Sequence, residues 1–105
     1  MKLPSTIINK VYTGQVIQSS SSSASNYRAA CRGKSKADFI NKLRIVEEEL
    51  DETMFFYEMI AEFNREFKDE LRELYKEADE LLSIIIASIN TANKNKLVQN
   101  PKSPI

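Results

Sequence analysis

A chain of 105 residues, 42% apolar and 29% charged, is long enough for one domain with a modest buried core. Its formal net charge is zero, which argues against strong nucleic-acid binding by the chain as a whole. The lack of histidine and the single cysteine, Cys31, exclude an intrachain disulfide and leave catalytic and metal sites without a usual base or ligand. We therefore expect a non-enzymatic protein of the reducing cytoplasm, with no catalytic residue, metal or other cofactor. The longest apolar run of the C-terminal half, 84–87, is too short to span a membrane, which takes about 20 residues.

The charges are divided unevenly along the chain. Eight basic residues and one acidic residue, Asp38, precede Glu47, so this part carries +7; seven basic and fourteen acidic residues give the rest −7. Such a division affects association and the choice of partner rather than the fold. It favours one helix pairing with another, within the chain or between subunits. The basic residues of the first part are Lys2, Lys10, Arg28, Arg32, Lys34, Lys36, Lys42 and Arg44.

The first predicted helix covers residues 6–32 and follows a short leader, residues 1–5. Apolar residues from Ile7 to Ile17 recur at spacings typical of one helix face. The run Ser19 to Ser25 is ambiguous. Its composition is that of a flexible linker, but its small side chains would also let a neighbouring backbone approach a helix closely. The residues alone leave both interpretations open.

The second and third helices are predicted at residues 36–63 and 66–94. Ser35, followed three residues later by Asp38, is a capping signal for the second helix. Both helices carry apolar stripes, and the short connection between them predicts antiparallel neighbours. The second helix is apolar on two sides, which a bundle or an oligomer would cover. A disordered tail is expected over 95–105. The residues expected to share one interior are Phe39, Leu43, Val46, Leu50, Tyr57, Leu74, Ala78, Leu81 and Ile85.

Two groups of polar side chains are candidate sites. Basic residues bracket the predicted turn between the first two helices, beside Tyr27, and could hold an RNA or DNA backbone. The alternative is a solvated turn with salt bridges to the acidic part of the chain. The candidate nucleic-acid-binding residues are Arg28, Arg32, Lys34, Lys36, Lys42 and Arg44. A candidate buried polar network, in which carboxylates turn inward to pair with arginines, comprises Asn26, Arg28, Arg44, Glu48 and Asp51.

Most of the chain, roughly residues 10 to 92, resembles a known family. The resemblance is carried by SNYRAACRGKSKADFINKL at 25–43, IVEEE at 45–49, DET at 51–53, EADEL at 77–81 and ASI at 87–89. These segments look like the four-helix-bundle family encoded in intervening sequences of bacterial 23S ribosomal RNA genes.

The resemblance implies a helical serine run and a homo-oligomer, with a pentamer as the implied form. Relatives include the accessory protein of diversity-generating retroelements, which is implicated in binding nucleic acid and a reverse transcriptase. Family members usually have a further amphipathic helix before this point, and Leu3-Pro4 falls where the first connection between helices would lie. The expected fold is therefore an all-α, antiparallel up-down bundle of three long helices, with the first helix of the family missing.

The combined prediction is a bacterial, cytoplasmic, non-enzymatic protein of helical-bundle type that self-associates. The alternative is a nucleic-acid-binding accessory subunit that uses the basic group at the first turn. No membrane partner is expected. Apolar faces that three helices leave uncovered make a monomer the unfavoured state.

Overall fold

The computed structural model describes residues 1–99, with side chains for residues 1–95. Three long helices, α1 (Ile7–Cys31), α2 (Lys36–Phe63) and α3 (Lys68–Gln99), form almost all of this part. A single 3-10 turn, η1 (Arg65–Phe67), precedes α3. Residues 1–99 contain no strand. The predictions of an all-α fold and of three long helices are confirmed.

The serine run lies inside α1, so the linker interpretation is wrong. Its hydroxyls bond within the helix; for example, the Ser23 hydroxyl donates to the Ser20 carbonyl at 2.9 Å. Ser19 and Ser23 are buried. Their small side chains allow α1 and α2 to approach closely, which is the other interpretation that the composition left open.

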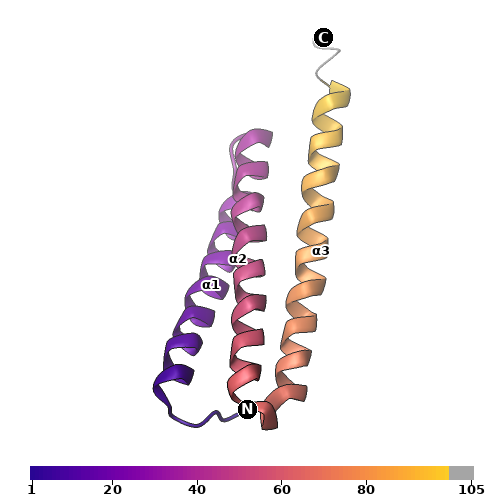
Figure 1. The fold of residues 1–105 in the computed structure, drawn as a ribbon. Helices are drawn as coiled ribbons and strands as arrows, with labels where there is room; N and C mark the ends of the chain where they lie inside the picture. Colours follow the sequence, from indigo (N-terminus) through magenta and orange to yellow (C-terminus); the bar gives the residue numbers. More distant parts are fainter. Residues whose placement is uncertain (100–105) are drawn as a thin grey trace.

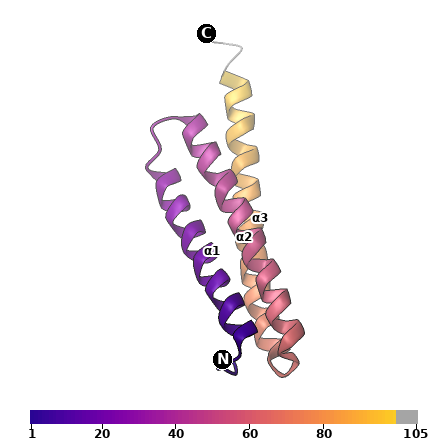
Figure 2. The ribbon, with the colours of Figure 1, turned by 60° about the vertical axis from the view of Figure 1, so that its left-hand side comes forward.

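The middle helix, α2, packs along both of the others, whereas α1 and α3 make no close backbone approach to each other within residues 1–99. The chain reverses direction at each connection (Figures 1 and 2). The connection between α1 and α2 therefore lies at one end, and the N-terminus lies at the other end with the connection between α2 and α3. The Cα atoms extend over 60 × 20 × 15 Å. The molecule is thus a long, flat layer in which one side of α2, between α1 and α3, is not covered by a helix.

The helix ends follow local capping chemistry. Thr6 accepts a hydrogen bond from the Asn9 backbone N–H at the start of α1, and Ser35 accepts one from the Asp38 N–H at 3.1 Å at the start of α2. The Ser35–Asp38 signal therefore marks the start of α2 as predicted. Asn64, which precedes η1, makes no side-chain cap to it. Its amide has another partner, described below.

The core is formed mainly between α2 and α3. Its largest cluster joins Leu43 and Val46 of α2 to Ile85 and Ile89 of α3. Of the nine residues expected to share an interior, Leu43, Val46, Leu50, Ala78 and Ile85 are buried, and Phe39, Tyr57 and Leu74 are half-buried. Leu81 was placed wrongly, because it is 54% exposed and faces the uncovered side of α2.

The last helix continues past its predicted end at residue 94, to Gln99. The first five residues of the predicted tail are therefore helical, and residues 100–105 lie outside the described part. None of the helices in residues 1–99 is long and apolar enough to cross a membrane.

Candidate assembly groove and basic end

A groove runs along the molecule between α1 and α3, with α2 as its floor. It consists of two hollows of about 640 and 530 Å³. Tyr57 of α2 and Leu74 of α3 line both, so the two hollows are adjacent. We call this feature the assembly groove, with a leader part at the end that holds the N-terminus and an open part toward the α1–α2 connection.

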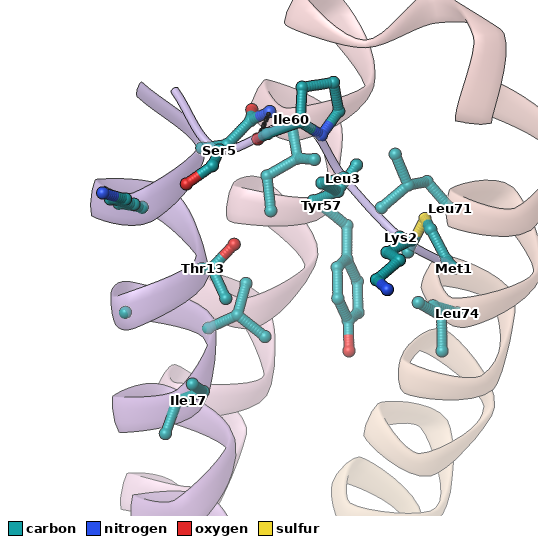
Figure 3. Close-up of a pocket in the computed structure, with 15 residues that line it drawn as sticks. Met1, Lys2, Leu3, Ser5, Thr13, Ile17, Tyr57, Ile60, Leu71 and Leu74 are labelled. Carbon is teal, nitrogen blue, oxygen red and sulfur yellow. Dashed lines mark hydrogen bonds between the residues drawn. The ribbon is translucent and has the colours of Figure 1, made fainter. Parts of the chain in front are cut away.

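The leader part is partly filled by the chain itself. In Figure 3 the segment from Met1 to Ser5 crosses from α1 toward α3, with Met1 and Leu3 on the side of Leu71. The Pro4 carbonyl accepts a hydrogen bond from the Asn9 side chain at 2.9 Å, which holds this segment in place. The chain thus covers one end of its own groove.

The open part has apolar side chains on both of its rims. Tyr27 of α1 is 50% exposed, and on α3 Leu81 and Ile84 are 54% and 60% exposed. Between them, small residues of α1 such as Ser20 and Ala24 line the wall, above a floor that includes Leu50. Ile84 also lines a third hollow of about 550 Å³, whose α3 side is uncharged as far as Asn95 and whose α2 side includes Lys36.

A pair of buried side-chain amides, Asn9 of α1 and Asn64 after α2, joins these two helices at the leader end. Asn9 donates to Asn64 at 2.9 Å, and Asn64 donates back to Asn9 at 2.6 Å. The second hydrogen of each amide is also used, by the carbonyl of Pro4 and by that of Ile60. All four N–H hydrogens therefore have acceptors, which allows both side chains to be almost fully buried.

A second buried polar contact joins α1 to α2 near the middle of the layer. The hydroxyl oxygens of Ser19 and Thr53 are 2.7 Å apart, and Thr53 donates to the Glu49 carbonyl at 2.8 Å. The Ser19 hydroxyl also donates to the Val16 carbonyl at 3.4 Å, and either hydroxyl can be the donor between Ser19 and Thr53. Neither this pair nor the amide pair was predicted from the sequence.

Ionisable groups on and near the groove are shifted toward their protonated forms. Burial raises the pKa of the Tyr57 phenol, and the Glu77 carboxylate raises it further. Burial also raises the pKa of Tyr75, with contributions from Glu58.

The six basic candidates gather at the end that carries the α1–α2 connection, and we call this the basic end. Residues 28–44 hold these six residues and one acidic residue, a charge of +5, whereas residues 47–80 hold fourteen acidic and four basic residues, a charge of −10. Four of the six are exposed, and Lys36 and Lys42 are half-buried. The basic end is thus positive and the part formed by residues 47–80 is negative, although Lys2 and Lys10 lie at the same end as that part and reduce its charge from −10 to −8.

The predicted buried polar network does not form within the single chain. Arg28, Arg44, Glu48 and Asp51 are exposed. Arg44, Glu48 and Asp51 line a surface hollow of about 480 Å³ together with Leu82 of α3, but within the described part of the chain no hydrogen bond or ion pair joins their side chains. The half-buried Asn26 donates instead to the Ser22 carbonyl of its own helix, at 2.9 Å. The buried polar positions are those of the amide and hydroxyl pairs described above.

No group of three histidine, cysteine, aspartate or glutamate side chains that could hold a metal ion occurs in the described part of the chain. Comparison with family models, with curated proteins and with solved structures finds no match. The resemblance to the 23S intervening-sequence family stays a prediction.

Proposed function

We propose that this protein is a non-enzymatic helical assembly module of the cytoplasm that binds further copies of itself through the assembly groove. The observation that carries the proposal is the groove itself, two adjacent hollows along the uncovered side of α2. Only Lys2, Lys10 and Glu77 among its lining residues are charged. Exposed apolar surface of this extent is typical of a surface that another protein covers.

The arrangement of the helices supports the same proposal. In an antiparallel four-helix bundle, one helix lies diagonally opposite another and contacts the two that flank it. The assembly groove lies over α2, between α1 and α3. A helix diagonally opposite α2 in a four-helix bundle would occupy this position. We infer that the three helices are part of an up-down bundle whose fourth position is filled from another copy. The resemblance to the 23S intervening-sequence family, with its homo-oligomers and its additional first helix, favours this interpretation.

Sedimentation equilibrium of the purified chain tests self-association, with one groove variant and one matched control. Ile84→Glu places a charge on the groove rim, and Ile86→Glu places the same charge two residues away on α3, outside the residues that line the groove. Both side chains are exposed, so neither substitution opens a core cavity. We expect the native chain and Ile86→Glu to associate at micromolar concentration and Ile84→Glu to be monomeric. A native chain that stays monomeric would refute the proposal.

The basic end favours a second candidate function, a nucleic-acid-binding accessory subunit. Arg28, Arg32, Lys34 and Arg44 are exposed at one end of the molecule, where they could contact phosphates. Retention on immobilised heparin and RNA at low and moderate salt tests this. If the double variant with Arg28→Gln and Arg32→Gln is retained less than the native chain, and its retention depends less on salt, the result would favour this function. Elution at low salt, unchanged in the variant, would exclude it.

A further inference from the structure

We infer that the occupant of the assembly groove is a second copy of the chain lying antiparallel to the first, related to it by a two-fold axis that crosses α3 near Leu81 and Ile84. This inference rests on the proposed function and adds the partner, its direction and its position. It is drawn from three features of the molecule: the leader, the exposed rim of α3 and the separation of charge between the two ends.

The leader decides which part of the groove receives the partner. Met1 to Ser5 already cover the leader part, and the amide of Asn9 holds them there through Pro4. The open part, between Tyr27 of α1 and Ile84 of α3, has no such cover. The open part is therefore where the partner packs, and Leu81 and Ile84 on its rim lie near the middle of α3.

The α3 rim is suited to a two-fold contact. In such a contact the same patch of both copies meets itself, so that residues near the axis pack against their own counterparts. Leu81 and Ile84 are exposed apolar side chains one helical turn apart, with the uncharged surface around Ser88 beyond them. An overlap from Leu74 to Thr91, the part of α3 that the leader does not cover, spans about 26 Å of helix. Over a molecule 20 Å wide, this gives roughly 500 Å² per copy, or about 1,000 Å² in total, the lower bound for a specific interface.

Charge decides the direction. An axis along the helices would place two copies in parallel, with the two basic ends side by side, each carrying +5 over residues 28–44. Two positively charged basic ends side by side would repel each other. The antiparallel pair instead brings Arg28 and Arg32 of one copy toward Glu73 and Glu77 of the other, within the part that carries −10. The same separation of charge that disfavours the parallel pair therefore stabilises the antiparallel one.

Distances between spin labels in the associated protein test the direction. Native Cys31 is exposed near the basic end and takes one label, and Glu66→Cys in a Cys31→Ser background takes a label at the opposite end. About sixteen residues separate position 66 from the axis, so the antiparallel pair predicts about 50 Å between the two labels at 66, and a distance roughly 25 Å shorter at Cys31. In a parallel pair both sites would give similar distances below about 30 Å, and that result would overturn the inference.

Neutralising charges gives a second test, because the change in the dissociation constant has opposite signs for an antiparallel and a parallel pair. Arg28→Gln with Arg32→Gln removes two positive charges from the basic end, and Lys68→Gln with Arg72→Gln removes two from the acidic part. The antiparallel pair predicts that the first variant raises the dissociation constant about two- to tenfold at low salt and that the second lowers it, with both effects smaller at high salt. The parallel pair predicts the opposite signs.

The outcomes separate this inference from the proposed function. A monomeric native chain refutes both. A groove-dependent assembly with short distances at position 66, with the opposite charge effects, or with the mass of a ring of five copies refutes the antiparallel pair alone.

Discussion

The hydrogen bonds of the buried amide pair, Asn9 and Asn64, predict how much stability is lost when either side chain is removed. Asn64→Ala removes three hydrogen bonds, two with Asn9 and one with the Ile60 carbonyl, and leaves the Asn9 amide without its partner in a buried site. A net hydrogen bond contributes about 0.5–1.5 kcal/mol, and an unpaired buried polar group costs about 1–3 kcal/mol. We expect Asn64→Ala to lower the free energy of unfolding by about 2–4 kcal/mol, and Asn9→Ala to have a similar effect.

The double variant distinguishes a pairwise contact from two independent losses. When both side chains are alanine, no unpaired amide is left, so the double variant should cost about 1–3 kcal/mol less than the sum of the single variants. Urea unfolding followed by circular dichroism measures all four free energies. It should be done in the Ile84→Glu background, so that association does not contribute to the measured stability. Strict additivity, or single losses below about 0.5 kcal/mol, would refute the reasoning.

Three further predictions concern single positions. Leu50→Ala should lower the free energy of unfolding by about 2–5 kcal/mol, because this side chain is buried, and a loss near zero in urea unfolding would contradict its place in the core. Gly14→Ala should raise the melting temperature through about 0.5–1 kcal/mol of stabilisation, since Gly14 is inside α1 and an added Cβ meets no atom within 4 Å; a lower melting temperature would contradict this. Burial and the neighbouring Glu52 and Glu48 raise the pKa of Glu49, so its contribution to stability is full below its ordinary pKa of 4.5 and is lost as pH rises through the raised pKa. Glu49→Gln should therefore be more stable than the native chain at pH 7 and equal to it below about pH 4, and the same difference at both pH values would contradict this.

Periodicity in the sequence was enough to find the helices but not to place them. The stripes of α2 and α3 predicted Leu43, Val46 and Ile85 as core residues, and all three are buried. Leu81 belongs to the same stripe by spacing, yet it is exposed, because it lies at the edge of the stripe on the side that a closed bundle would have covered. Spacing along one helix does not say whether a neighbour is present on that side.

The buried polar positions could not be found from residue types. Charged residues near the first turn suggested Arg28 and Asp51 as members of a network, but long charged side chains reach solvent at little cost, and both are exposed. The polar residues that are buried, such as Asn9 and Thr53, carry no charge and lie far from their partners in sequence. The basic end was easier to predict, because its residues are close together in the chain.

The way α1 is attached to α2 has a consequence for the order in which the protein opens. The fully buried residues of α1 are Asn9, Ser19, Ser23 and Ala30, so none of its large apolar side chains is fully buried against α2. Serine is a weak helix former, at roughly 0.5 kcal/mol per residue below alanine, and Gly14 adds about 1 kcal/mol more. This helix keeps its shape because α2 is beside it. Most of the buried apolar core lies between α2 and α3, and α1 adds Ala30 to it and packs Tyr12 against Phe56 and Phe63. Amide hydrogens of α1 should therefore exchange with solvent through an opening that leaves α2 and α3 intact, which makes one wall of the assembly groove its most adaptable element.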